Sequence, residues 1–322
     1  MASEPRPVIV DTDTAGDDTQ ALMYAAATDR LELEAVTICA GNVPFDYQVE
    51  NAKHTLEIAG LADKVTVYEG ARKPLLVDSD HADYVHGEGG LGGKRFPDTG
   101  IPSGDRHAAN YIVDAARERP GELTLVCIAP LTNLALALRL ESDLGALLDE
   151  VWVMGGNVNC LGNVTPAAEY NFWFDPHAAR LAMDELDVTL FDWGVTVRDS
   201  AFTGATIDGW LAELDTERAA LFGDISGSVR EFTEAELGED MTTQPDAGLV
   251  AALAGPELIE AEGTYHVSVD EREGITRGYT AVDELGGGDG EPRTRVIEAI
   301  DGERFRAGFR AMLAGRAPES AW

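Results

Sequence analysis

The stretch Pro7-Val8-Ile9-Val10-Asp11-Thr12-Asp13-Thr14-Ala15-Gly16-Asp17-Asp18 joins a short apolar run to four aspartates that fall within eight residues. Asp and Glu make up 58 of the 322 residues, so composition alone would place about 1.4 acids in such a window. The apolar run predicts a buried strand, and Asp17 and Asp18 open a predicted helix, whose N-terminal dipole favours carboxylates. Four acids at a strand end predict a site for a hard cation.

Similar apolar runs recur along the chain and are separated by segments with helical spacing. The runs cover residues 8–10, 33–39, 65–68, 123–128, 151–154 and 188–191, and the helical segments cover residues 17–28, 49–59, 107–117 and 131–140. This alternation predicts an α/β protein with a Rossmann-like core, in which helices flank an open, mostly parallel sheet. The intervening segments are long enough for right-handed crossovers.

The second half of the chain changes character after about residue 200. The pattern becomes more helical, and we expect residues 200–245 to form a helical cap within one domain that spans residues 1–322. Residues 262–270 and 278–282 predict a hairpin-like pair of strands, and the Gly-rich tract at 286–290 predicts a loop. No linker or internal repeat divides the chain.

Composition excludes several classes of partner. The net charge is −34, and such a field repels nucleic acid and anionic membranes. No apolar run is long enough to span a bilayer, and the start Met1-Ala2-Ser3-Glu4-Pro5 has no basic region followed by an apolar stretch. Cys39, Cys127 and Cys160 are an odd number, and the first two lie in strand-like runs, as reduced core thiols do. We expect a soluble, cytoplasmic protein.

Polar residues follow several of the predicted strands. Ligands bind beyond the carboxyl ends of the strands in open α/β sheets, so these positions are candidates for a site. Asn42 follows the second strand, and Thr132 and Asn133 follow the fourth, although each of these alone could be an ordinary turn or N-cap residue. The loop 162–172 after the fifth strand is dense in amide and carboxylate groups, which favours a binding role.

Taken in order, these motifs resemble those of the nucleoside hydrolases of the inosine–uridine preferring type. The similarity runs from about residue 7 to residue 255. Its motifs are Asp11-Thr12-Asp13-Thr14-Ala15-Gly16-Asp17-Asp18, Gly41-Asn42, His86-Gly87-Glu88-Gly89-Gly90-Leu91-Gly92, Pro130-Leu131-Thr132-Asn133, Met154-Gly155-Gly156 and Ala168-Glu169-Tyr170-Asn171.

The resemblance implies calcium-dependent hydrolysis of the N-glycosidic bond of ribonucleosides to ribose and free base. Asp13 would be the general base that activates a metal-bound water, and the transition state would be oxocarbenium-like. The implied calcium contacts are Asp13, Asp18, the Thr132 carbonyl and Asp246, and Asp11 would support this group from behind. The implied substrate contacts are Asp17, Asn42, His86, Met154, Asn163, Glu169, Asn171 and Asp246, with His86 near the base. Members of the family often form dimers or tetramers.

Two sites depart from the family pattern. Thr14-Ala15 stand where the family usually has Pro-Gly, although Gly16 still supplies a flexible residue before the helix. The second departure concerns the leaving base. Members that favour inosine and uridine commonly carry a histidine before the last calcium aspartate, where it protonates the leaving base, whereas this chain has Pro245. Other branches activate a purine by placing it between aromatic residues. Arg230, Glu239, Asp240 and Gln244 are nearby polar candidates in the sequence, so the acid for the leaving group and the base specificity stay open.

Three alternatives compete with this interpretation. A phosphatase of the haloacid dehalogenase type also carries Asp-x-Asp after a strand, but phosphoryl transfer needs a cationic group for phosphate, and the loop 162–172 instead suits neutral hydroxyls. A non-catalytic, calcium-dependent binder of ribose or nucleosides would retain the acids and lack the histidine. A hydrolase of a different ribosyl substrate would retain the same sugar contacts.

The charge of −34 also predicts adaptation to high salt. At about 1 M salt the Debye length falls to about 3 Å, so self-repulsion among the acids is screened. We therefore expect folded structure to be lost in dilute buffer and retained in molar KCl, as measured by circular dichroism. A spectrum that does not change when salt is removed would contradict this hypothesis.

Overall fold

A computed structural model describes residues 4–78 and 80–322 of the chain. Its main feature is a nine-stranded sheet with the order β10-β9-β11-β6-β5-β4-β1-β2-β3. The nine strands are β1 (Arg6–Thr12), β2 (Leu31–Ile38), β3 (Thr66–Glu69), β4 (Thr124–Cys127), β5 (Glu150–Met154), β6 (Val188–Phe191), β9 (Ile259–Val269), β10 (Thr280–Asp283) and β11 (Thr294–Ile300).

The sheet is mostly parallel, as the sequence predicts. Strand β1 pairs in parallel with β2 on one side and β4 on the other, and β5, β6 and β11 continue the parallel part. Side chains alternate between the two faces of a strand. Val8 and Val10 therefore enter one apolar core, and Ile9 between them enters the core on the opposite face.

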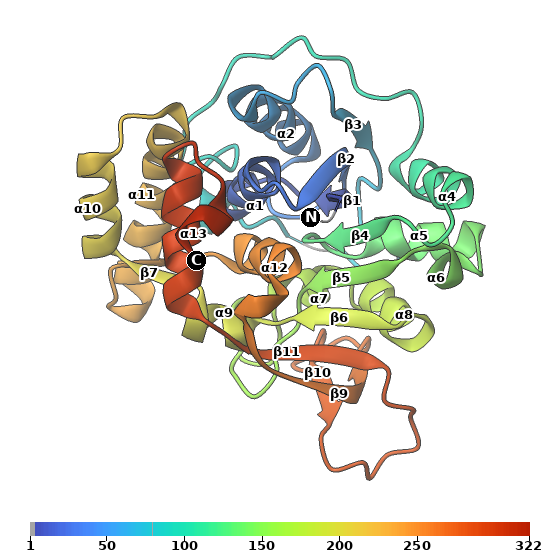
Figure 1. Ribbon diagram of the computed structural model, residues 1–322. Helices are drawn as coiled ribbons and strands as arrows, with labels where there is room; N and C mark the ends of the chain where they lie inside the picture. Colours follow the sequence, from blue (N-terminus) through green and yellow to red (C-terminus); the bar gives the residue numbers. More distant parts are fainter. Residues whose placement is uncertain (1–3, 79) are drawn as a thin grey trace.

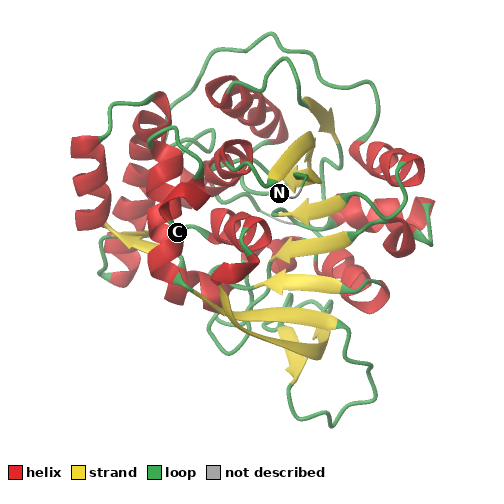
Figure 2. Ribbon diagram, viewed as in Figure 1, coloured by secondary structure: helices red, strands yellow, loops and turns green. Residues whose placement is uncertain are grey.

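Helices cover both faces of this sheet (Figures 1 and 2). Residues of α1, α2, α12 and α13 contribute to one core, and residues of α4, α5 and α8 contribute to the other. The α-helices are α1 (Gly16–Ala27), α2 (Phe45–Ala59), α3 (Asp83–His86), α4 (Ala108–Glu118), α5 (Thr132–Leu140), α6 (Leu144–Leu147), α7 (Tyr170–Phe174), α8 (Pro176–Glu185), α9 (Trp193–Asp199), α10 (Gly204–Glu213), α11 (Glu217–Leu237), α12 (Pro245–Ala254) and α13 (Gly302–Leu313), and two short 3-10 helices cover Pro256–Leu258 and Pro318–Ala321.

The antiparallel edge of the sheet contains one strand that the sequence analysis does not predict. The expected pair is present, because β9 and β10 are antiparallel neighbours. Strand β11 follows them in the chain but lies between β9 and β6, antiparallel to the first and parallel to the second. Its sequence mixes apolar residues with Arg295 and Glu298, so it lacks the continuous apolar run by which the other parallel strands are found.

The segment expected to be a helical cap contains α10 and α11 between two short strands, β7 (Ala201–Thr203) and β8 (Met241–Thr243), which pair with each other. Aromatic side chains join this segment to α13. Phe309 of α13 has its ring centroid 4.8 Å from that of Phe202, 5.2 Å from Phe222 and 5.9 Å from Phe305. The packing of α10, α11 and α13 at one end of the molecule is visible in Figure 1.

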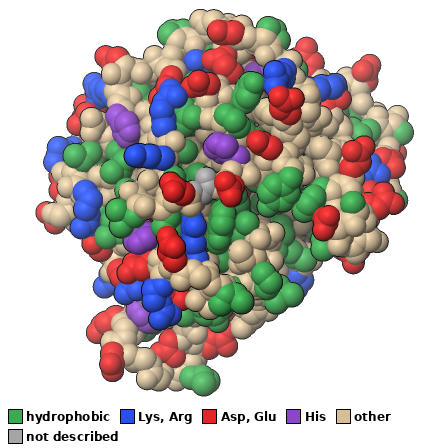
Figure 3. All heavy atoms as spheres, turned by 180° about the vertical axis from the view of Figure 1, so that it is seen from behind, with side chains coloured by type: hydrophobic (Ala, Val, Ile, Leu, Met, Phe, Trp, Pro, Cys, Tyr) green, Lys and Arg blue, Asp and Glu red, His purple; other side chains and the backbone are tan. Residues whose placement is uncertain are grey.

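Further expectations from the sequence concern the surface charge, membrane-spanning helices, the cysteines and the N-terminus. Acidic side chains are spread over the face seen in Figure 3 instead of forming one patch. Within residues 4–78 and 80–322, no helix has the length and apolar character needed to cross a membrane. Cys39 and Cys127 are free and buried. Residues 1–3, on which the expectation of no secretion signal partly rests, lie outside the described residues.

We predict that Phe309→Ala destabilises the protein by about 3–5 kcal/mol, because the ring is fully buried and its removal leaves a cavity among other aromatic rings. The free energy of unfolding from urea titration measures this loss. Leu285→Ala is the matched control, since Leu285 is 97% exposed and its loss is expected to cost less than about 0.5 kcal/mol. Equal losses of unfolding free energy in the two variants would contradict a stabilising role for the packing of Phe309 against the other aromatic rings.

Candidate functional site

A cavity of about 790 Å³ lies beyond the carboxyl ends of the parallel strands, between the sheet and α11. One wall carries residues at or just after the ends of β2, β4 and β5 and from the start of α1, and another comes from the loop 160–164 and from α7. The remainder comes mainly from α3, α9, α11, β8 and the start of α12. All eight predicted substrate contacts line this cavity: Asp17, Asn42, His86, Met154, Asn163, Glu169, Asn171 and Asp246.

Asp13 lies directly after β1, and its carboxylate is held at one oxygen. The backbone N–H of Asn42 donates to Asp13 Oδ2 at 2.7 Å, and Gln48 Nε2 donates to the Asp13 carbonyl at 2.9 Å. Asp13 Oδ1 is buried and has no hydrogen-bond partner in the part of the chain that the structure describes. A side chain at Gly41 would overlap the Asp13 carboxylate, so the close approach of these two segments requires glycine.

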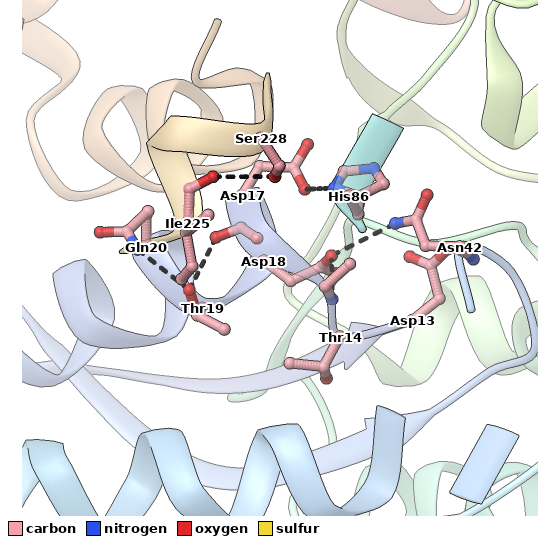
Figure 4. A network of polar contacts seen from close by, with 12 residues as sticks. Asp13, Thr14, Asp17, Asp18, Thr19, Gln20, Asn42, His86, Ile225 and Ser228 are labelled. Carbon is pink, nitrogen blue, oxygen red and sulfur yellow. Dashed lines mark hydrogen bonds and ion pairs between the residues drawn. The ribbon is translucent and has the colours of Figure 1, made fainter. Parts of the chain in front are cut away.

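Asp17 and Asp18 lie in the first turn of α1, as the sequence predicts, and Asp17 lines the cavity together with Asp246 from the first turn of α12. Carboxylate oxygens of these three residues lie within 4.8 Å of one another. Asp18 is fixed by Thr12 Oγ1 at 2.5 Å and by the backbone N–H of Ala15 at 2.9 Å. Figure 4 shows Asp13, Asp17 and Asp18 with the neighbouring Asn42 and His86.

Burial and mutual repulsion make these acids hard to ionise. Burial raises the pKa of Asp13 and Asp246 well above the ordinary value, and the charges of neighbouring aspartates raise both further. Burial also raises the pKa of Asp17 and Asp18 to about 6. A cation among these oxygens would favour the ionised forms, because opposite charge stabilises a carboxylate.

The donor set fits a hard divalent cation. Asp17, Asp18 and Asp246 offer clustered carboxylate oxygens, and Asp13 Oδ1 is an additional buried oxygen that lacks a partner among the described residues. Oxygen-only ligands are those that Ca²⁺ and Mg²⁺ prefer. The resemblance implies a substrate role for Asp17, whereas the geometry also brings this residue into the acidic cluster.

Thr132, whose carbonyl the resemblance places at the metal, begins α5 after β4 and is 1% exposed. Its hydroxyl donates to Asp175 Oδ2 at 2.7 Å. Asp175 also accepts the N–H groups of Ala178 and Leu75, so it anchors three segments beside the site. Asp175 follows no predicted strand, so its position in the sequence does not indicate this supporting role.

The predicted sugar contacts of the loop after β5 are fixed by hydrogen bonds to the backbone. Glu169 is 2% exposed and accepts N–H groups of Gly156 and Asn171, each at 2.9 Å. Burial raises its pKa to about 7. Asn171 Nδ2 donates to the Met154 carbonyl at 3.2 Å, and Asn163 Oδ1 accepts the N–H of Tyr170 at 2.9 Å.

His86 ends the short helix α3 and lies at the acidic cluster. Its Nδ1 is 3.9 Å from Asp17 Oδ1 and has no hydrogen-bond partner within the described chain. Burial lowers the pKa of His86 to about 4. The side chain is 9% exposed, so His86 is a buried, cavity-lining residue and not a residue of the surface.

Asp11 points to the back of the site. It accepts Thr37 Oγ1 at 2.5 Å and Asn133 Nδ2 at 2.8 Å, and burial raises its pKa to about 7. Asn133 also donates to the Ile38 carbonyl and accepts the N–H of Ala71. Asn133 therefore joins the ends of β1 and β2 to the loop after β3, which is a supporting role that its sequence position only partly indicates.

The four candidates for activating the leaving base fall into two groups. Arg230 Nε contacts Asp240 Oδ1 at 2.6 Å, so these two side chains are paired with each other, and neither lines the cavity. Glu239 and Gln244 do line it, together with Pro245. The aromatic residues Tyr84 and Phe232 also line the cavity, with ring centroids 5.7 Å apart.

Comparison with known proteins gives a consistent result. Residues 8–307 match the sequence profile of the family described as inosine-uridine preferring nucleoside hydrolase. The pyrimidine-specific ribonucleoside hydrolase RihB of Escherichia coli (strain SE11) is 31% identical over 302 residues, which cover 94% of this chain and 95% of that protein.

Two solved structures extend the similarity to the fold. A plant nucleoside hydrolase, PpNRh1, superposes with a TM-score of 0.90 and 29% identity over 96% of this chain and 99% of that chain. A purine-preferring ribonucleoside hydrolase from Gardnerella vaginalis gives a TM-score of 0.88 and 28% identity over 96% and 98%. The chain therefore belongs to the inosine-uridine preferring nucleoside hydrolase family, whose enzymes hydrolyse the N-glycosidic bond of ribonucleosides.

Proposed function

We propose that this protein is a calcium-dependent ribonucleoside hydrolase that releases ribose and free base in the cytoplasm. The observation that carries the proposal is the convergence of all eight predicted substrate contacts on one cavity, next to a cluster of carboxylates of which Asp18 and Asp246 are buried and Asp17 is half-buried. The named relatives differ in the base that they prefer, being pyrimidine-specific or purine-preferring. Ribose is the part their substrates share, so the proposal names ribonucleosides as the substrate class.

Asp13 is the proposed general base. The N–H of Asn42 donates to Oδ2 of Asp13. Oδ1 has no partner among the described residues and can therefore accept a proton from water. Holding one oxygen fixes the plane of the carboxylate, so Oδ1 is oriented before substrate binds. Water then adds to the anomeric carbon while the bond to the base breaks.

Asp13, Asp18, Asp246 and the Thr132 carbonyl are the proposed calcium contacts, and the geometry adds Asp17 as a further carboxylate within reach. A bound calcium ion would neutralise part of the acidic charge, orient water and sugar hydroxyls, and make the water more acidic. The residues themselves supply the rest of the environment, because buried carboxylates stabilise the positive charge that develops on the sugar.

Asn42, Asn163, Glu169 and Asn171 are the proposed contacts to the ribose hydroxyls. Each has a polar side chain that lines the cavity, and the backbone bonds of Glu169 and Asn171 fix these groups before binding. Several contacts to the sugar can orient and distort it, so that binding energy lowers the barrier. Met154 covers the sugar with an apolar surface.

The proposal is tested by release of reducing sugar from a panel of purine and pyrimidine nucleosides in molar KCl. We expect ribose with added calcium and little with a chelator. Asp13→Asn should lower kcat by at least about 100-fold, because an amide cannot accept the proton that a general base removes. Failure to release ribose from any nucleoside would contradict the hydrolase, and calcium-dependent nucleoside binding without ribose would indicate a binding protein.

Gly41→Ala offers a second test that leaves every polar side chain in place. The added methyl group overlaps the Asp13 carboxylate, so we expect Asp13 to move and kcat to fall by at least about 10-fold, as misplacement of catalytic groups commonly does. Gly209→Ala is the control, since Gly209 lies within α10 and, apart from its own helix, no atom of the described residues is within 4 Å of its added Cβ. Unchanged kcat in Gly41→Ala would argue against Asp13 as the base.

A further inference from the structure

We propose that the carboxamide of Gln244 contacts the leaving base and stabilises, by hydrogen bonding, the negative charge that the base acquires as the N-glycosidic bond breaks. The inference rests on the proposed hydrolase function. It assigns a catalytic role to a residue that belongs to none of the motifs of the resemblance.

Gln244 is positioned firmly at the cavity wall. It is 4% exposed, lines the cavity, and is the N-cap residue of α12. Its backbone N–H donates to the Ser200 carbonyl at 2.9 Å, which extends the pairing of β7 with β8. Pro245 and Asp246 follow it and line the same cavity, so Gln244 lies two residues before a carboxylate of the acidic cluster.

The side chain of Gln244 has unused hydrogen-bonding capacity. Nε2 donates to Thr242 Oγ1 at 3.3 Å, while Oε1 is buried and has no partner among the residues that the structure describes. A carboxamide has two N–H donors and an acceptor oxygen, so a donor and an acceptor are both available to a ligand. A buried oxygen without a partner is unfavourable, so a base that offers an N–H group to Oε1 would relieve this cost. The second N–H of Nε2 is the donor that would stabilise the negative charge on the base.

Two other cavity-lining residues also have a buried polar atom without a partner in the described chain, namely Asp17 at Oδ1 and His86 at Nδ1. Both already have an expected place at the metal, the sugar or the base. Gln244 is the third residue of this kind, and it lies beside Pro245, where the usual proton donor is missing. Gln244, whose Oε1 lacks a partner among the described residues, therefore lies next to the position where the family's usual proton donor is missing.

The rival polar groups in this region are less suited to the task. Arg230 is bound to Asp208 and Asp240 and does not line the cavity. Glu239 lines the cavity but is exposed, so water competes for its carboxylate. A buried amide keeps its full hydrogen-bonding strength, since a bond in a water-poor site is electrostatically stronger.

The reaction balances without a proton from Gln244. The bond between the anomeric carbon and the base nitrogen breaks, and its electron pair goes to the base. Water supplies hydroxide to the carbon and a proton to Asp13, and the departing base afterwards takes up a proton from solvent. A donor directed at the charge that develops on the base lowers the barrier without being consumed, as donors in an oxyanion hole do.

The test compares two kinds of substrate in Gln244→Met, which keeps the size of the side chain and removes the amide. Nucleosides such as inosine and uridine depend on stabilisation of the leaving base, whereas 4-nitrophenyl riboside releases a stable phenolate unaided. We expect kcat/KM on the better nucleoside to fall by about 100-fold to 1,000-fold, the range for loss of one such donor, and hydrolysis of the nitrophenyl riboside to fall by less than about 3-fold.

Gln20→Met is the matched control. Gln20 is also buried, its Nε2 also donates to a threonine hydroxyl, Thr19 Oγ1 at 3.0 Å, and its Oε1 also lacks a partner in the described part, but it does not line the cavity. We expect Gln20→Met to leave the ratio of the two activities unchanged. Gln244→Ala, measured per folded molecule by circular dichroism, supplies the same comparison if the Met variant does not fold.

Equal losses on both substrates, or no loss on nucleosides, would overturn the role of Gln244 while leaving the hydrolase proposal intact. A wild-type protein that cleaves neither nucleosides nor the nitrophenyl riboside would instead overturn the hydrolase proposal and this inference with it. The two failures are therefore distinguishable.

Discussion

The architecture of this protein depends on keeping several carboxylates buried and close together at the carboxyl ends of a parallel sheet. Asp17, Asp18 and Asp246 bring oxygens within 4.8 Å of one another, and Asp13 lies close enough for their charges to raise its pKa. Such a group is unfavourable on its own, because burial and like charge both oppose ionisation. The hydrogen-bond donors to Asp13 and Asp18 are backbone N–H groups and a hydroxyl, which are neutral, so these acids are oriented without having their charge cancelled.

The interior of the sheet and the loops beside it hold this unfavourable group of carboxylates in place. β1 is an interior strand of the nine-stranded sheet, and Asp13 follows its end directly. Behind it, Asn133 ties Asp11 to the Ile38 carbonyl and to the N–H of Ala71. Gly41 lets the loop after β2 approach closely enough for its neighbouring N–H to reach Asp13. Repulsion is therefore opposed by hydrogen bonds from several separate segments.

The opposite side of the cavity is built differently. There α11 and β8 supply largely apolar and neutral polar side chains, and α11 belongs to an assembly of helices joined by the rings of Phe202, Phe222 and Phe309. The sheet side thus carries the groups proposed to act on ribose, and under that proposal the helical side would face the base. This division agrees with a family in which related enzymes share a sugar and differ in the base named for them.

Sequence by itself determined the parallel core and most of the polar residues that line the sheet side of the cavity, because apolar runs mark buried strands and the acids and amides follow those strands directly in the chain. The sequence does not predict strand β11, because Arg295 and Glu298 interrupt its apolar pattern and its pairing with β9 is a long-range contact. Tertiary structure alone decided that Asp17 joins Asp246, that Arg230 pairs with Asp240, and that Gln244 is buried with an oxygen that has no partner among the described residues. These outcomes depend on contacts between segments far apart in the chain, or on burial, neither of which local sequence spacing can specify.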